Sequence, residues 1–266
     1  MVRNGLHRWR VCKVGVFAGP ERNVSLQTTS GRSLYSLGVV QDGLVLNLDA
    51  GKFYSYPKSG TIWTDLSGRG NNGTLVGGTG YSGTNGGSLV FDGTDDYVGV
   101  NNSASINPTI GITVASFFNV TSFGSNYAPI VFKQNNYATF FEQYMMYLVN
   151  TEIGFGITGV DRNQKYAKSI ADYRNQTIYL VGTCDTNTDE LKLYVNGTLI
   201  QTVAFTSTFD ISSTPINIGG SGVLNYSANF NGWTNGKIYS TQIYNRALTA
   251  TEITQNFNAT RSRFGI

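Results

Sequence analysis

From about residue 43 onward, short stretches of alternating apolar and polar residues recur along the chain. Turns rich in Gly, Asn, Asp and Ser separate these stretches, which is the pattern of short β-strands joined by tight turns. The pattern predicts strands at Leu44–Leu48, Ser88–Phe91, Ile112–Val120, Pro129–Phe132, Tyr144–Val149, Ile153–Ile157, Ile178–Thr183, Leu191–Val195, Thr198–Ala204, Ile216–Ile218 and Lys237–Tyr244. Many short strands at this spacing are typical of a β-sandwich.

The clearest local signal is a hairpin centred on Asn196-Gly197. Asn-Gly readily takes the positive φ values of a type I′ turn, so it predicts a tight connection between Leu191–Val195 and Thr198–Ala204. The sequence LKLYV of the first strand alternates apolar residues with Lys and Tyr. This alternation predicts a strand that buries one face and is exposed on the other.

One helix is predicted near the C-terminus. Thr249 and Glu252 have the spacing of a capping box, and Ile253 and Phe257 form an apolar pair one turn apart. We expect this helix to be short and to lie at the periphery.

The composition suits a sheet-rich protein, because 32 of the 266 residues are Gly and only 13% are charged. A sandwich of this size can form one domain. Cys12 and Cys184 lie far apart and His7 is the only histidine, so a four-ligand zinc site is excluded and both thiols are expected to be free. No stretch approaches the roughly 18 apolar residues of a membrane span, and we expect neither a signal peptide nor a membrane partner.

Residues 1–40 differ from the rest, and we expect them to form a basic arm ahead of a domain at residues 41–266. Residues 1–32 hold six Lys and Arg residues and one Glu, a net charge of +5. Basic and apolar residues are interleaved there, so the segment is either a solvated tail or an arm that docks on an acidic surface. The candidate attachment residues are Arg3, Arg8, Trp9, Arg10, Lys13 and Phe17. Nucleic acid is an unlikely partner, since no recognised binding motif accompanies the charge.

Five segments in a fixed order carry a family resemblance. They are GLVLNLDAG at 43–51, WTDLSGRGNNGTL at 63–75, GGSLVFDGTDDYV at 86–98, LKLYVNG at 191–197 and KIYSTQIYNRALTATEI at 237–253. The set resembles the laminin-G-like, concanavalin A-like jelly-roll family. The resemblance implies an all-β, two-sheet antiparallel jelly-roll sandwich, here with an N-terminal arm and one short C-terminal helix.

The segments at 43–51 and 63–75, together with the ending IYNRALTATEITQNF, also resemble versions of this domain in virion proteins of tailed bacteriophages. That resemblance implies a non-enzymatic structural or decoration protein of the virion, made in the host cytoplasm. Its partners would be other virion proteins and copies of itself in a homo-oligomer, with a trimer as the first guess. The alternative is a carbohydrate-binding adhesin or a tail-associated receptor-binding module with a host-surface glycan as partner.

Within these segments, Asp65 is expected to accept backbone N–H groups and to organise the turn that follows it. Trp63 is expected in the core rather than at a ligand, because large aromatic residues fill sandwich interiors.

The stretch FDGTDDYV places Asp92, Asp95 and Asp96 within five positions at the tip of a hairpin. Hard cations such as Ca²⁺ need several converging oxygens, and some members of the family carry calcium near the rim of the sheet. The alternative is that Asp92 and Asp95 only organise the turn through backbone N–H groups. No cofactor is required, and a structural calcium ion is the one candidate.

A loop at residues 219–236 is rich in aromatic and amide side chains, which are the groups that hold sugars. The candidate glycan-binding residues are Asn225, Tyr226, Asn229, Phe230, Asn231 and Trp233. The alternative is an ordinary Gly/Asn-rich connection whose aromatic rings pack on the body of the domain.

Catalysis is disfavoured, and a glycan hydrolase is the third function considered. Retaining glucanases on this fold need two carboxyl groups about 5–5.5 Å apart, commonly from alternate positions of one strand. The five glutamates are Glu21, Glu142, Glu152, Glu190 and Glu252, and no two of them have that spacing. No catalytic residue is therefore assigned.

Overall fold

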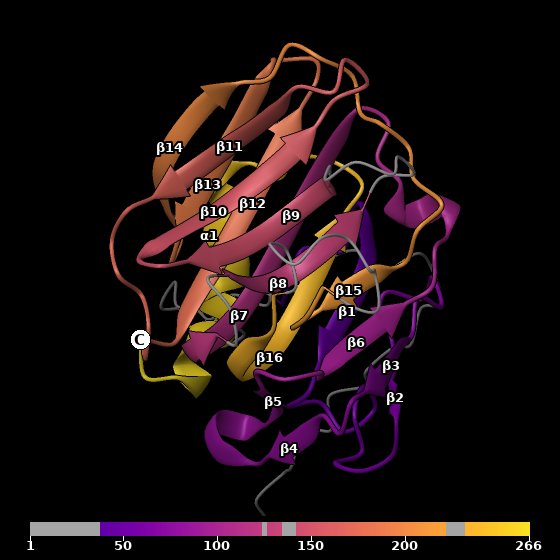
Figure 1. Cartoon of the computed structure of the whole chain (residues 1–266), viewed down its shortest axis with the longest axis vertical. Coiled ribbons are helices and arrows are strands. Elements are labelled where there is room, and N and C mark those ends of the chain that lie inside the picture. The colour runs from indigo at the N-terminus through magenta and orange to yellow at the C-terminus, as the bar shows by residue number, and fades with distance from the viewer. Residues whose placement is uncertain (1–37, 124–126, 135–141, 222–231) are drawn as a thin grey trace, which may run out of the picture. The chain divides into compact units, whose positions relative to one another are not determined.

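The computed structural model describes residues 38–123, 127–134, 142–221 and 232–266. The described residues form two antiparallel β-sheets packed face to face (Figure 1). The predicted jelly-roll sandwich with one short C-terminal helix is confirmed. The proposed arm at residues 1–40 lies almost wholly outside the described residues, as do all six of its candidate attachment residues.

The first sheet has eight strands, seven of them in one continuous order. They run β14 (Thr198–Ala204), β13 (Glu190–Val195), β12 (Ile178–Asp185), β7 (Gly111–Phe123), β16 (Thr234–Tyr244), β5 (Ser88–Asp92) and β4 (Gly80–Ser82), and β1 (Leu44–Asp49) also pairs with β16.

The second sheet also has eight strands. Their order is β11 (Gln164–Ser169), β10 (Glu152–Thr158), β9 (Glu142–Val149), β8 (Tyr127–Gln134), β15 (Ile216–Ile218), β6 (Tyr97–Val100), β3 (Gly73–Val76) and β2 (Ile62–Trp63). Short 3₁₀ helices lie at η1 (Thr84–Gly86), η2 (Ala104–Ile106) and η3 (Arg261–Arg263).

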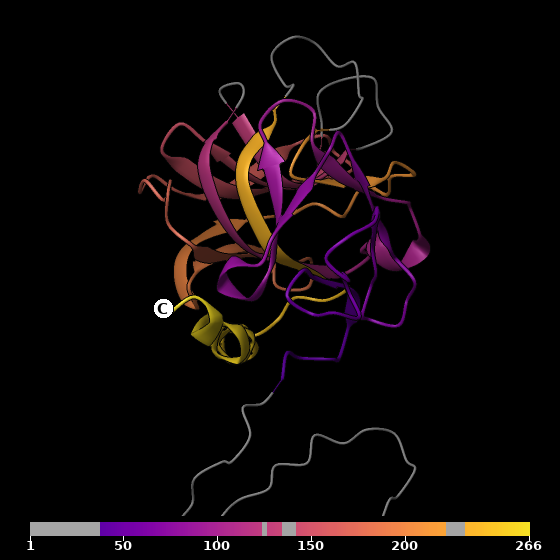
Figure 2. The same cartoon turned by 90° about the horizontal axis from the view of Figure 1, so that it is seen from below.

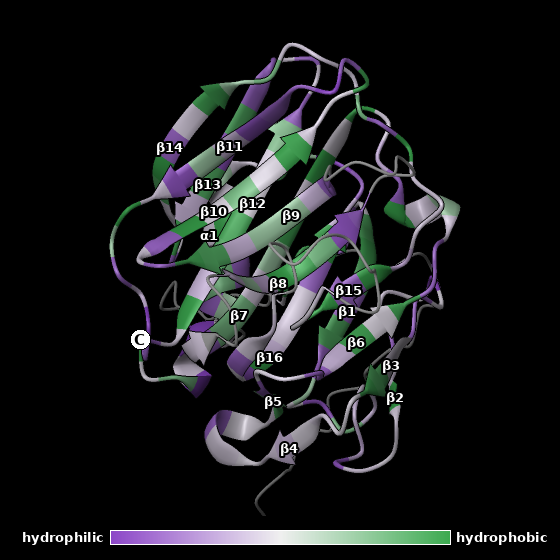
Figure 3. Cartoon of the chain, in the orientation of Figure 1, coloured by the Kyte–Doolittle hydropathy of each residue, from purple (hydrophilic) through white to green (hydrophobic). Residues whose placement is uncertain are grey.

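Apolar side chains from both sheets fill the space between them. Strands of both sheets alternate between hydrophobic and hydrophilic residues along their length (Figure 3). The inward residues Phe118 and Leu180 of the first sheet and Met146 and Phe155 of the second are all essentially inaccessible to solvent. Burial of these inner faces supplies the main driving force for the sandwich.

The helix α1 (Ala250–Thr260) covers part of the outer face of the first sheet (Figure 2). The predicted capping box is present, since Thr249 Oγ1 accepts a hydrogen bond from Glu252 N at 3.3 Å and Thr249 N donates to Glu252 Oε2 at 2.8 Å. Phe257 stacks on Phe117 and Tyr179 with ring centroids 6.2 and 6.0 Å away. Tertiary packing therefore fixes a helix that would be marginal in isolation. No helix within the described parts of the chain is both long enough and apolar enough to span a membrane.

All eleven predicted strands are present, with ends shifted by a few residues. The Asn-Gly hairpin is confirmed, because Asn196 and Gly197 have φ values of 50° and 81°, both positive as a type I′ turn requires. Five strands were missed, namely β2, β3, β4, β6 and β11. Four of these are no longer than four residues, and β11 (QKYAKS) is too polar to show an apolar period.

The turn after β2 forms as predicted around one carboxylate. Asp65 Oδ1 accepts from Asn47 N at 2.8 Å and from Ser67 N at 2.9 Å, and Oδ2 accepts from Asn71 N at 3.0 Å. Trp63 is fully buried, which confirms its assignment to the core. Cys184 is a buried free thiol, as expected, and Cys12 lies outside the described residues.

Candidate functional site

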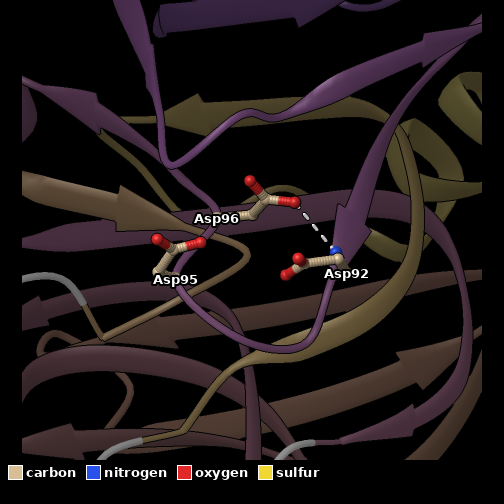
Figure 4. A group of neighbouring side chains, drawn as sticks. All are labelled: Asp92, Asp95 and Asp96. Atoms are coloured by element: carbon tan, nitrogen blue, oxygen red, sulfur yellow. Dashed lines mark hydrogen bonds between the residues drawn. The ribbon is translucent and has the colours of Figure 1, made fainter.

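The acidic turn joins β5 to β6 at one end of the sandwich. Asp92 ends β5, Asp95 and Asp96 precede Tyr97 of β6, and Gly93 provides a positive φ of 84°. One carboxylate oxygen from each of the three aspartates lies within 4.8 Å of the others (Figure 4). The sequence-predicted trio is therefore brought together in space.

Two of the three aspartates also build the turn. Asp92 Oδ1 accepts from Thr94 N at 2.7 Å, and Asp96 Oδ2 accepts from Asp92 N at 2.9 Å (Figure 4). Asp92 has the turn-forming role that the simpler interpretation gave it. The second such carboxylate is Asp96, whereas Asp95 is exposed and makes no hydrogen bond among the described contacts of the turn.

Asp96 is the unusual member of the acidic turn. Its side chain is only 4% exposed, and its second oxygen, Oδ1, is buried without a hydrogen-bond partner. Burial raises the pKa of Asp96 above its usual value, the negative charges of Asp92 and Asp95 raise it further, and the hydrogen bond from Asp92 N opposes both. A carboxylate in this setting gains from a cation. The residues present fit a hard, oxygen-ligated ion such as Ca²⁺.

Trp233 lies directly beside the acidic turn. Its ring is half-buried and packs on Tyr97 with centroids 6.3 Å apart, and its backbone bridges to Gly220. A Cβ atom placed on Gly220 would lie 2.6 Å from the Trp233 ring and 2.8 Å from the carbonyl oxygen of Asp96. The acidic turn and the candidate sugar platform, which were predicted separately, thus form one surface. We call it the rim site and define it as Asp92, Asp95, Asp96, Tyr97 and Trp233.

The remaining candidate glycan-binding residues are not placed. Asn225, Tyr226, Asn229, Phe230 and Asn231 lie outside the described residues. Trp233 is partly exposed and also packs on Tyr97, so it shares features of both interpretations of its loop. Its environment was not evident from the sequence, because Tyr97 is distant from it along the chain.

The sequence analysis missed a cluster of tyrosines and glutamates on the outer face of the second sheet. Tyr166 Oη donates to Glu142 Oε1 at 2.6 Å, and Gln164 Nε2 donates to Glu142 Oε2 at 3.0 Å. Tyr147 Oη donates to Glu152 Oε1 at 2.9 Å, and the Tyr147 and Tyr166 rings meet edge to face at 5.9 Å. We call these five residues the tyrosine–glutamate cluster.

Burial dominates the electrostatics of this cluster. It raises the pKa of Glu142 to about 7, although the hydrogen bonds from Tyr166 and Gln164 act in the opposite direction. Glu152 is less buried and forms an ion pair with Lys168, with Oε2 and Nζ 2.9 Å apart. A carboxyl group that titrates near neutral pH is a candidate acid–base group, so the cluster is a second candidate region beside the rim site.

One sequence signal could have located the cluster. In β10 the residues Gly154 and Gly156 alternate with inward apolar residues, and a Cβ atom at either glycine would collide with the ring of Tyr147 or Tyr166. Alternating glycines in a strand indicate that something packs closely on that face.

A family model for the concanavalin A-like lectin/glucanases superfamily, in its laminin-G form, matches residues 92–254. The chain belongs to this superfamily. The matched segment begins at Asp92 of the acidic turn and includes Trp233 and the tyrosine–glutamate cluster, so both candidate regions lie within the superfamily domain. No curated protein sequence matches the chain.

Several solved structures share the fold of the chain. The binding domain of Paraclostridial Mosquitocidal Protein 1 superposes with a TM-score of 0.63 at 16% identity, over 82% of this chain and 52% of that one. The receptor binding domain of botulinum neurotoxin D gives 0.62 at 15% identity over 82% and 52%. A botulinum neurotoxin serotype D ligand binding domain in complex with N-acetylneuraminic acid gives 0.56 at 17% identity over 82% and 51%. The chain spans about half the length of these structures, and the likeness is one of fold.

Proposed function

We propose that this chain is a carbohydrate-binding module of the adhesin type, and that it binds sugar at the rim site. The observation that carries the proposal is the packing of Trp233 and Tyr97 beside the three carboxylates of the acidic turn. Aromatic rings stack on the apolar faces of sugars, and nearby polar groups fix the orientation of the hydroxyls. The rim site offers both within one surface.

The comparisons support the adhesin interpretation over the structural one. The matched superfamily includes lectins by its own description, and the similar solved structures are binding domains, one of them in complex with a sialic acid. Those ligands belong to those proteins. For this chain they favour a host-surface glycan as the partner without specifying which sugar.

We further propose that the acidic turn holds a structural calcium ion. Asp92, Asp95 and Asp96 would supply carboxylate oxygens, with the buried Oδ1 of Asp96 as the central ligand. The bound ion would neutralise the turn and fix the backbone that leads into Tyr97. Chelation would then loosen the platform on which the sugar stacks.

The proposed function is non-enzymatic. In the tyrosine–glutamate cluster each oxygen of Glu142 and Glu152 already contacts a protein group, which suits carboxylates that brace neighbouring rings. Purified protein is expected to leave β-glucans and bacterial polysaccharides intact. Release of reducing sugar that disappeared on substituting Glu142 or Glu152 would contradict this assignment.

Placement on a bacteriophage particle remains a proposal that rests on the sequence resemblance and on the basic arm. If residues 1–40 attach the domain to a virion, deleting them should leave cooperative unfolding unchanged and abolish co-sedimentation with particles that lack the native protein. A truncated domain that still attached at full occupancy would contradict the role of the arm. The rim site would be unaffected by that result.

A glycan array probed with wild-type protein and Trp233→Ala tests the sugar-binding proposal. We expect the substitution to weaken glycan affinity at least tenfold. The melting temperature should stay close to that of wild type, because Trp233 is only half-buried. Tyr54→Ala is the matched control, since Tyr54 is an aromatic residue that is 86% exposed on the connection between β1 and β2.

Unchanged array binding by Trp233→Ala would exclude the rim site. If that variant fails to fold, Trp233→Leu keeps an apolar side chain at the position without an aromatic ring, and a folded Leu variant that bound as well as wild type would exclude the rim site. Wild-type protein that bound no glycan on the array would exclude the proposed function.

A further inference from the structure

A groove lies on the outer face of the first sheet. It is an open groove of about 340 Å³ that crosses β5, β16 and β7. Its walls combine three asparagines, two threonines, one lysine and one tyrosine with the apolar residues Val90 and Phe91. We call it the amide groove, and the residues used below are Asn119, Thr121, Thr177, Asn235, Lys237 and Tyr239.

The strand register holds these side chains together. Lys237 of β16 lies between Val90 of β5 and Asn119 of β7, so all three point to the same outer face. Tyr239 is buried at one end, where its ring meets that of Phe264 with centroids 4.7 Å apart. Because the groove is built on hydrogen-bonded central strands, its polar groups are held more rigidly than groups on a loop.

Internal hydrogen bonds orient the two amides. The Thr121 hydroxyl is shared between two acceptors of Asn235, the backbone oxygen at 3.0 Å and Oδ1 at 3.2 Å, and the Asn235 Nδ2 group points away from this contact. Asn119 Nδ2 donates to Thr177 Oγ1 at 3.4 Å, which leaves Asn119 Oδ1 as an acceptor. The groove therefore presents one amide donor and one amide acceptor on adjacent strands, a pair suited to neighbouring hydroxyl groups.

Lys237 gives the groove a positive charge. Across the described ranges of the chain no acidic group forms an ion pair with its ammonium group. The nearest acidic position in the register is Asp92, which lies opposite Asn235, and Asp92 Oδ1 accepts the hydrogen bond from Thr94 N within the acidic turn. A half-buried lysine among amides favours an anionic ligand over a neutral one.

We propose that the amide groove is a second ligand site, specific for a carboxylated sugar such as a hexuronic acid or a sialic acid. The sugar carboxylate pairs with Lys237, and adjacent hydroxyls bond to Asn119 and Asn235. Each contact is individually weak, so a single sugar binds weakly, and an oligomer that repeats the acidic unit binds more tightly because any of its units can occupy the groove. The proposal goes beyond the rim site and does not depend on it.

Two probes test the site, an oligogalacturonate and an oligomer of sialic acid, each titrated by calorimetry against an uncharged glucan oligomer. We expect at least one acidic probe to bind wild-type protein. Lys237→Met should weaken that binding at least tenfold, and Asn119→Ala should weaken it severalfold. Lys165→Met is the matched control, because Lys165 is an exposed lysine on β11 of the second sheet and should leave binding unchanged.

Trp233→Ala separates the groove from the rim site, since acidic-probe binding should survive this substitution whether or not the rim site binds sugar. Three results would overturn the proposal. These are no binding of either acidic probe, equal binding by wild type and Lys237→Met, and equal weakening by Lys237→Met and Lys165→Met, which would indicate non-specific attraction to positive charge.

Discussion

The rim site and the tyrosine–glutamate cluster both hold a buried acidic group, but the carboxylate oxygens are hydrogen-bonded to different extents in the two regions. In the cluster, both oxygens of Glu142 are bonded, one to Tyr166 and one to Gln164. At the rim, Asp96 has one oxygen bonded to Asp92 N and one buried oxygen with no partner. A buried polar atom without a partner costs free energy, and the unpartnered Oδ1 leaves Asp96 with an oxygen to which an external group could bind.

The difference fits a structural role for the cluster and the proposed binding role for the rim site. The cluster is complete from protein groups alone, and its rings pack against glycines of the same sheet. In the proposed calcium site an external cation completes the rim, because Asp92 and Asp95 beside Asp96 are themselves negatively charged. The number of satisfied oxygens therefore distinguishes the two regions better than their burial, which is high in both.

The largest expected effect concerns the pH dependence of the cluster. Burial raises the pKa of Glu142 to about 7 in the folded state from an ordinary 4.5. The folded protein thus holds this proton more tightly than the unfolded chain does, so the stability from this group is fully present below pH 4.5 and is lost as the pH rises through 7. The loss amounts to about 3 kcal/mol in the free energy of unfolding.

Glu142→Gln isolates this contribution. We would measure the unfolding free energy of the variant and of wild type by denaturant titration from pH 4.5 to 8. As the pH rises, wild type should become progressively less stable than the variant. A difference that stayed constant over that range would show that Glu142 is not held in this buried state, and the contrast with the rim would fail.

A second prediction tests whether the glycines of β10 position the tyrosines. Gly156→Ala would place a Cβ atom against the Tyr166 ring and displace it from Glu142, and we expect the free energy of unfolding to fall by about 1–3 kcal/mol. Gly99→Ala is the matched control in β6, because its Cβ atom would approach the Tyr97 ring only to 3.5 Å, an ordinary contact. Equal losses for both variants would mean that the close packing at Gly156 is unimportant.

How far the sequence could predict each region depends on the distance between partners along the chain. The Thr249 and Glu252 cap, the Asn196-Gly197 turn and the hydrogen bonds of Asp65 to the residues after it are local, and the sequence predicted all of them. The three aspartates of the acidic turn were likewise found together because they lie within one short hairpin.

The tyrosine–glutamate cluster could not be predicted in the same way. Its residues come from β9, β10 and β11, and the pairing of β8 with β9 shifts where Lys133 faces Tyr144 and Gln134 faces Glu142. A one-residue shift changes which face of a strand a side chain occupies, so alternation in the sequence cannot place Glu142. Trp233 meets Tyr97 for a similar reason, since the pairing of distant segments brings them together.

The smallest expected effect is at the rim, and it has opposite signs with and without calcium. In the presence of a chelator, Asp96→Asn removes a buried negative charge beside Asp92 and Asp95. The free energy of unfolding of the variant should therefore exceed that of wild type by about 1 kcal/mol, and its melting temperature should be slightly higher. Added Ca²⁺ should raise the melting temperature of wild type through binding to the folded state, and should have little effect on the variant. Asp189→Asn is the control, because Asp189 is exposed in a turn with a φ of 55°, a conformation that Asn also accepts.

Calcium that stabilised Asp96→Asn as much as wild type would place the ion elsewhere. A negative outcome has two parts: calcium leaves the melting temperature of wild type unchanged, and Asp96→Asn is no more stable than wild type in chelator. Together they would show that the unpartnered oxygen of Asp96 has no binding role. The two regions would then differ only in their hydrogen bonds.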